Sequence, residues 1–183
     1  MRELSLHILD IVQNSISAGA TLIEIDIQED VASDLLGIDI KDNGRGMSSE
    51  TLKTVSDPFV TTRTTRKVGL GLSLLKSAAE LCGGQMNISS TLGKGTEVKV
   101  TFIYSHIDRV PLGDMSETLL TLVMCNPHID FIYRHAVNKS EFWFDTREIK
   151  QMIEGVEINN TEVVSWMRQY LNEQIKSLYG GVL

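Results

Sequence analysis

Apolar residues recur at two spacings along this chain, and each spacing predicts one type of secondary structure. Between residues 4 and 17 they return every three or four positions, which is typical of an α-helix that buries one face. Between residues 21 and 28 they alternate with polar residues, which is typical of a half-buried strand. The predicted helices are 4–17, 49–55, 72–82, 115–125, 146–154 and 160–178. The predicted strands are 21–28, 36–40, 85–90, 96–102, 130–136 and 141–145.

The pattern changes near residues 105–112, where Pro111 and Gly113 interrupt it. We therefore expect two regions, 1–104 and 105–183. The second is predicted to be a small α+β appendage made of a helix, a hairpin and two more helices. Its apolar and aromatic residues fit a packed unit that completes a core or a dimer interface, or a docking surface for a specific partner.

Composition narrows the class of protein. The chain of 183 residues is 42% hydrophobic and 22% charged, as in an ordinary globular protein. It has 17 basic and 24 acidic residues, and this net charge of −7 argues against nucleic-acid binding or attachment to a membrane surface. No apolar run approaches the ~20 residues needed to span a bilayer, and no signal peptide is evident. Cys82 and Cys125 form neither a disulfide framework nor a zinc motif, so we expect a cytoplasmic protein.

Asp10 and Asn14 are the first candidates for chemistry. They are four residues apart in the first predicted helix, so their side chains lie on one helix face, away from the apolar stripe. An amide oxygen is a suitable ligand for Mg²⁺, and a carboxylate can orient a water molecule. Solvated polar pairs without a function occur at the same spacing.

A second candidate follows the predicted strand 36–40. Asp42 stands at the strand end, and Gly44 and Gly46 come directly after it. A carboxylate in this position can accept a hydrogen bond from an exocyclic amine such as that of adenine, and glycines let the backbone approach a flat ring. An Asp-Asn-Gly segment is also a common turn.

A third candidate opens the helix at residue 72. Gly69 and Gly71 would expose backbone N–H donors to a phosphate group. The segment is not a dinucleotide-binding fingerprint, because Leu74 replaces the third glycine and no strand precedes it, and the chain has no Walker A sequence. The densest basic cluster of the chain lies in the preceding loop, at Arg63, Arg66 and Lys67.

Taken together and in this order, the segments resemble the GHKL superfamily of ATP-binding domains, which includes histidine kinases, anti-sigma serine kinases, gyrase and MutL-type ATPases. Residues 8–21 (ILDIVQNSISAGAT) resemble its N box and residues 42–47 (DNGRGM) its first glycine box. Residues 57–63 (DPFVTTR) resemble the F box of histidine kinases, and residues 68–102 resemble the second glycine box with its closing strands. The resemblance covers about residues 3–104.

The resemblance implies a role for each matching residue. Asn14 would ligate Mg²⁺, Asp42 would bind the adenine amine, and Arg63 would contact phosphate. The remaining residues implied in binding ATP are Gly44, Gly46, Met47, Gly69, Leu70, Gly71, Leu72 and Thr96. Of these, Met47 would line the base pocket, and Thr96 would support the adenine site through its hydroxyl.

Two departures from the family pattern bear on activity. Asp10 stands where ATP-hydrolysing relatives usually have Glu, and its shorter side chain withdraws the carboxylate from the substrate. A misplacement of ~1 Å can cost ~100-fold in rate. The chain also begins at the N box, so we expect no helical hairpin with a phosphoacceptor histidine. We interpret His7 as structural, and His106, His128 and His135 as ordinary surface or packing residues.

The resemblance implies a Bergerat-type fold, a two-layer α/β (α+β) sandwich with a mixed, mostly antiparallel sheet. It also implies binding of ATP and Mg²⁺, and two functions stay open. One is a stand-alone kinase, with a protein phosphoacceptor in trans, or a slow ATPase in bacterial-type signalling. The other is an ATP-dependent switch that binds a partner with little turnover. A homodimer is compatible with both. By the resemblance, residues 59–69 would form a short lid, and residues 105–183 would be too few for the transducer domain of mismatch-repair or gyrase proteins.

Overall fold

The computed structural model describes residues 3–55 and 70–180. The strands are β1 (Leu22–Asp30), β2 (Leu35–Asp42), β3 (Gln85–Thr91), β4 (Gly95–Ile103), β5 (Asp130–Val137) and β6 (Ser140–Asp145). The helices are α1 (Leu4–Ser17), α2 (Ser49–Val55), α3 (Leu70–Leu81), α4 (Met115–Cys125), α5 (Thr146–Met152) and α6 (Thr161–Leu178). Each of these elements was predicted from the sequence to within a few residues. The predicted loop 61–68 lies outside the described residues.

The six strands form a single sheet in the order β3-β4-β2-β1-β5-β6. Neighbouring strands are antiparallel, except that β1 and β5 run parallel, with Ile25 opposite Tyr133. The expected mixed, mostly antiparallel sheet is confirmed. The parallel pair requires a crossover connection, because parallel strands cannot be joined by a tight turn. The segment that contains α4 completes this connection from the first part of the chain to β5.

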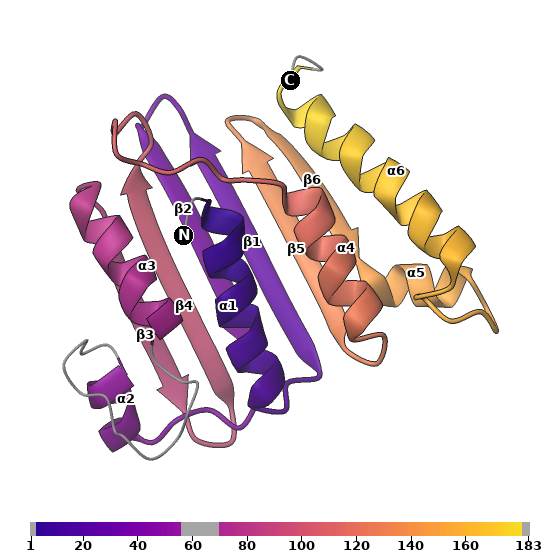
Figure 1. Cartoon of the computed structure of the whole chain (residues 1–183), viewed down its shortest axis with the longest axis horizontal. Helices are drawn as coiled ribbons and strands as arrows, with labels where there is room; N and C mark the ends of the chain where they lie inside the picture. Colours follow the sequence, from indigo (N-terminus) through magenta and orange to yellow (C-terminus); the bar gives the residue numbers. More distant parts are fainter. Residues whose placement is uncertain (1–2, 56–69, 181–183) are drawn as a thin grey trace.

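The major helices pack on one face of the sheet, as Figure 1 shows for α1, α3 and α4. Alternate strand residues point toward this helical layer, and they are almost fully buried, as the 0–1% exposure of Ile23, Ile25 and Ile27 illustrates. Helix α6 packs against α4, β5 and β6 in the same layer, and the ring of Tyr170 meets that of Phe142 edge-on at 5.7 Å. The fold is therefore a two-layer sandwich.

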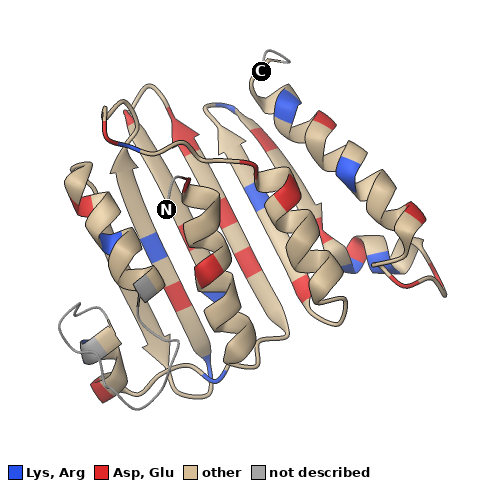
Figure 2. Cartoon of the chain, viewed as in Figure 1, with Lys and Arg blue, Asp and Glu red and all other residues tan. Residues whose placement is uncertain are grey.

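The other face of the sheet carries charged residues, and no helix covers it in the part of the chain that the structure describes. Red and blue segments mark these residues on the strands in Figure 2. Several of them pair across strands, including Lys99 with Asp39 at 3.3 Å and Arg134 with Asp26 at 3.0 Å. Exposed ion pairs of this kind add little stability, but they keep the sheet surface hydrated.

Residues 105–183 extend the sheet rather than only covering it. Strand β5 pairs with eight of the nine residues of β1, and the loop before α4 binds the start of α1. There, the backbone N–H groups of Leu4 and Ser5 donate to the carbonyl oxygens of Pro111 and Leu112, at 2.9 and 2.7 Å. A division at residue 104 stays a prediction, but one sheet runs across it.

The length and apolar character of the helices bear on whether any of them could cross a membrane. Among residues 3–55 and 70–180, none of the helices combines the length and the apolar character that a bilayer crossing requires.

Candidate functional site

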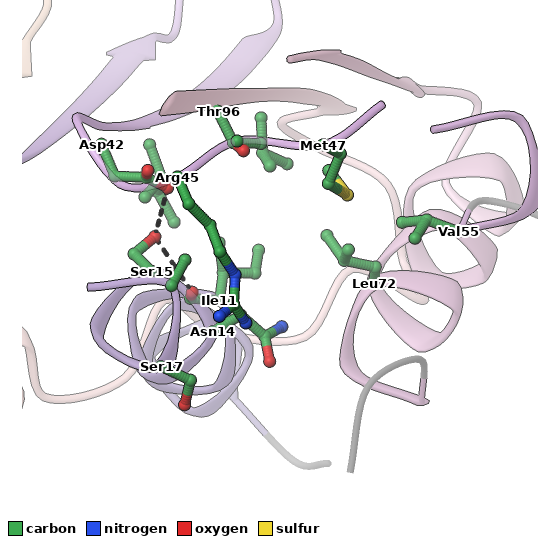
Figure 3. Close-up of a pocket in the computed structure, with 14 residues that line it drawn as sticks. Ile11, Asn14, Ser15, Ser17, Asp42, Arg45, Met47, Val55, Leu72 and Thr96 are labelled. Atoms are coloured by element: carbon green, nitrogen blue, oxygen red, sulfur yellow. Dashed lines mark hydrogen bonds between the residues drawn. The ribbon is translucent and has the colours of Figure 1, made fainter. Parts of the chain in front are cut away.

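A cavity of about 370 Å³ opens between α1, α3 and the ends of β2 and β4 (Figure 3). Its described lining residues are Ile11, Asn14, Ser15, Ser17, Ala18, Ile40, Asp42, Arg45, Gly46, Met47, Val55, Leu72, Thr96 and Val98. Most of this lining surface is apolar, and the polar side chains stand at its edges on α1 and at the ends of β2 and β4. A slot with this character suits a flat aromatic ring whose polar edge meets a small number of fixed hydrogen-bonding groups.

Asp42 is the acidic group of this cavity, and it is only 9% exposed at the end of β2. The hydroxyl of Ser15 on α1 donates to Asp42 Oδ2 at 2.7 Å, and the backbone N–H of Gly44 donates to Oδ1 at 2.8 Å. Both bonds fix the orientation of the carboxylate. Because each carboxylate oxygen can accept a further bond, Asp42 can still receive a donor from a ligand.

Glycines beside Asp42 let three segments of backbone meet. Gly46 has a φ of +64°, and a Cβ there would lie 2.1 Å from the carbonyl oxygen of Thr91. Gly95 has a φ of +106°, and a Cβ there would lie 1.9 Å from the carbonyl oxygen of Asp42. Side chains at these positions would push the β3–β4 turn away from the chain that follows β2.

Thr96 faces Asp42 across the β2–β4 pair. Its hydroxyl lies 2.9 Å from that of Ser90, which accepts from the backbone N–H of Met47 at 2.8 Å and donates to the carbonyl of Gly95 at 2.9 Å. Because Ser90 has one proton and uses it at Gly95, Thr96 donates to Ser90 and keeps its lone pairs for the cavity. Ser90 therefore positions both Met47 and Thr96.

The other end of the cavity lies at the junction of α1 and α3. Asn14 and Leu72 line it, while Asp10 is exposed and is not among the lining residues. Asp10 lies beside Gly71, since a Cβ on Gly71 would be 3.1 Å from Asp10 Cβ and 3.3 Å from Oδ2. The absence of a side chain at Gly71 allows the start of α3 to approach α1 closely.

Mg²⁺ fits this end of the cavity through the amide oxygen of Asn14. Within the described ranges, no group of three or more His, Cys, Asp or Glu side chains could hold a metal ion. A protein site with a single oxygen ligand matches the habit of Mg²⁺, which keeps several waters and takes other ligands from substrate phosphates. The ion would then depend on the nucleotide for its remaining ligands.

The structure brings most of the predicted site residues together. The cavity lining includes Asn14, Asp42, Gly46, Met47, Leu72 and Thr96, while Gly44 and Gly71 support its walls from behind. Leu70 is the first residue of α3. Arg63 and Gly69 were also predicted, and both lie outside the described residues, as does the expected lid.

Sequence reasoning missed Ser15, Arg45 and Ser90. Ser15 carries a signal, because it continues the apolar stripe of α1 through Ile8 and Ile11 and is a polar residue on a buried face. Arg45 lies within the first glycine box, between Gly44 and Gly46, at a position where the family pattern implies no role. Ser90 gave no signal, since its contact with Met47 joins segments 43 residues apart.

Comparisons with known proteins agree with this geometry. A family model described as histidine kinase-, DNA gyrase B-, and HSP90-like ATPase matches residues 2–105. A sensor protein of Shewanella frigidimarina is 39% identical over 111 residues, which are 58% of this chain and 17% of that protein. Sporulation kinase D of Bacillus subtilis is 41% identical over 64 residues, which are 35% of this chain and 12% of that protein. The chain spans less than a fifth of the length of these relatives.

Two solved structures share the fold. The N-terminal domain of a DNA repair protein has a TM-score of 0.56 at 17% identity, covering 98% of this chain and 57% of its own. The Aquifex aeolicus MutL ATPase domain complexed with ADP has a TM-score of 0.52 at 16% identity. The match covers 84% of this chain and 70% of the MutL chain. The expected Bergerat fold is confirmed. Because the family model matches more than half of its residues, the chain belongs to the family of histidine kinase-, DNA gyrase B- and HSP90-like ATPases.

Proposed function

We propose that this chain binds MgATP in the cavity between α1 and β4 and uses it to phosphorylate a protein partner in trans or to hydrolyse it slowly. The observation that carries the proposal is the Asp42 carboxylate, held by Ser15 and Gly44 at the end of an apolar slot. A fixed carboxylate in such a slot fits the exocyclic amine of adenine. The MutL ATPase domain of the same fold was crystallised with ADP.

Each part of the cavity then has a task. The adenine ring would lie between the apolar side chains of Ile40, Met47 and Val98, with its amine on Asp42 and the Thr96 hydroxyl close by. The phosphates would extend toward Asn14 and the start of α3, because the N-terminal end of a helix favours an anion. Mg²⁺ bound through Asn14 would neutralise phosphate charge. The chain's own contribution is to orient the nucleotide and exclude water around its base.

A second function, an ATP-dependent switch with little turnover, is favoured by the place of Asp10. Its carboxylate is exposed and is not among the described lining residues, and its side chain is shorter than the Glu usual in ATP-hydrolysing relatives. Helix α1 also connects the cavity to the rest of the molecule, because it carries Asn14 and binds the loop before α4 through Leu4 and Ser5. A change at the nucleotide would then reach the surface formed by residues 105–183, where a partner would bind.

Replacing Asp42 by Asn tests the binding mode. The Asn side chain has one acceptor oxygen and an NH₂ group, which is itself a donor and repels the adenine amine. The thermal stabilisation of the protein by MgATP should therefore be mostly lost. Asp39→Asn is the matched control, because Asp39 lies on the same strand but pairs with Lys99 on the opposite face. Equal stabilisation of both variants by MgATP would contradict the adenine assignment.

Incubation with γ-labelled ATP separates the two functions. Label on a protein of a cell extract supports a kinase, and released phosphate alone supports an ATPase. Tight binding of ATP with neither result supports the switch and overturns the enzymatic proposal.

A further inference from the structure

One cation lies on the wall of the cavity. Among its described lining residues, Arg45 is the only base, as Asp42 is the only acid. Figure 3 shows the Arg45 side chain extending from the segment after β2 toward Asn14 on α1. We infer that Arg45 binds the phosphate groups of the nucleotide and makes the site selective for polyphosphates over nucleosides. This inference rests on the proposed function, since it assumes that adenine lies at Asp42.

The backbone of Arg45 is held on both sides. Its N–H donates to the carbonyl of Ala18 at 3.0 Å, and its carbonyl accepts from the N–H of Gly93 at 2.7 Å. These bonds attach the residue to the end of α1 and to the β3–β4 turn at once. The direction in which the side chain leaves the backbone is therefore fixed by the fold, although the residue is exposed.

The guanidinium of Arg45 is available for a ligand. Arg134, Arg147 and Arg168 each form an ion pair with a carboxylate. Arg109 donates to the carbonyl of Tyr104 and lies over its ring. Among the arginines that the structure describes, Arg45 alone has a guanidinium with no hydrogen bond, ion pair or ring contact to another described residue. In a chain with a net charge of −7, an unpaired arginine at a cavity is a local exception.

Phosphate is the ligand class that this arrangement fits. A guanidinium offers five donors and no acceptor, and it pairs with two phosphate oxygens at once. Arg45 and Asn14 both line the cavity. A phosphate chain that leaves the adenine at Asp42 and runs toward Asn14 would pass this group. The two charged residues of the wall would thus have different tasks. Asp42 would bind the adenine ring, and Arg45 would bind the phosphates.

The test compares ATP, ADP, AMP and adenosine as ligands of the wild type, Arg45→Ala and Arg45→Lys by titration calorimetry. Arg45→Ala should weaken ATP about 10- to 100-fold, the loss expected for charge-assisted hydrogen bonds, and leave adenosine unchanged. Arg45→Lys should recover part of the loss, because it keeps the charge but not the paired donors. Lys41→Ala is the control, since Lys41 pairs with Glu24 on the open face.

Each outcome bears on a different claim. If Arg45→Ala weakens adenosine as much as ATP, or weakens neither, the phosphate assignment is overturned. The former result would mean that Arg45 contacts the base or the ribose. If the wild type binds neither ATP nor adenosine, the proposed function fails and this inference falls with it. If Asp42→Asn abolishes binding while Arg45→Ala does not alter it, the proposed function stands and only the inference fails. Equal thermal stability of the variants without ligand shows that they are folded.

Discussion

At the scale of single residues, the site depends on groups that leave no room for substitution. Gly46 combines two separate constraints. Its φ of +64° lies in the left-handed region, and a Cβ would collide with the carbonyl oxygen of Thr91. Gly93 has a similar φ of +78°, but a Cβ there would meet nothing within 4 Å. The two positions therefore separate the cost of backbone conformation from the cost of a steric clash.

Gly46→Ala should destabilise the protein clearly more than Gly93→Ala. The conformational term alone is about 1–2 kcal/mol, and Gly46 adds the displacement of the β3–β4 turn. Because that turn leads directly into Gly95 and Thr96 at the start of β4, the variant should also weaken ATP binding. Chemical denaturation of both variants, followed by ATP titration, gives the two quantities. Equal losses of stability would mean that the backbone adapts to the added methyl group.

The residues that sequence reasoning found are those whose signal is local. Asp42 follows an alternating strand, and Asn14 lies one helical turn after Asp10, so both could be identified from their neighbours in the chain. The contacts of Ser15 with Asp42 and of Ser90 with Met47 join residues 27 and 43 positions apart. Such contacts depend on how helices and strands pack, which no local pattern encodes.

At the scale of elements, a buried polar network ties β1, β5 and the end of α6 together. His135 is fully buried, and its Nε2 lies 2.9 Å from Oε1 of Glu29 on β1. Its Nδ1 lies 2.9 Å from the hydroxyl of Tyr133, and the hydroxyl of Tyr179 donates to Glu29. The interpretation of His135 as a packing residue missed this network, because its partners lie on three different elements.

The network predicts a dependence of stability on pH. Burial raises the pKa of Glu29, but the hydrogen bonds from His135 and Tyr179 outweigh burial and hold this pKa below its usual value of 4.5. The folded state thus favours the carboxylate. Its contribution to stability is complete above pH 4.5 and is lost as the pH falls through the lower folded pKa.

Tyr179→Phe should lower the free energy of unfolding at pH 7 by about 1–3 kcal/mol, because a buried carboxylate loses one donor. The difference from wild type should narrow as the pH falls through the lowered pKa of Glu29 and its carboxyl group becomes protonated in both proteins. Chemical denaturation of both proteins at several pH values measures this difference in the free energy of unfolding. Tyr170→Phe in α6 is the control, because the contacts of Tyr170 are made by its ring, with Phe142 and Trp166, and the substitution keeps that ring. A difference that stays constant with pH would exclude the carboxylate as its cause.

At the scale of the whole molecule, the sequence indicated two regions, and the structure joins them through one sheet. Periodicity predicted β1 and β5 separately, but nothing in either strand shows that they pair over eight positions. Strand pairing at a separation of more than a hundred residues depends on the complete chain. For this reason the elements were predicted well, and the way in which residues 105–183 attach was not.

Removing residues 105–183 tests the division at residue 104. The fragment would expose the backbone edge of β1 and the part of α1 that packs on α4. An unpaired strand edge favours aggregation, so we expect a broad, low-temperature transition or precipitation. Calorimetry and light scattering of the fragment beside the full chain provide the measurement. A sharp transition with retained ATP binding would show that residues 1–104 fold as a domain of their own.

Helix α1 has a mechanical consequence for the molecule. It has 14 residues and is about 20 Å long, with the cavity at its C-terminal end and the Pro111–Leu112 backbone hydrogen-bonded to its N-terminal end. The backbone hydrogen bonds along a helix make it stiff along its axis, so we expect a displacement of one end to shift the other. A ligand that displaces Asn14 would therefore also act on Pro111 and Leu112, in the segment that leads into α4.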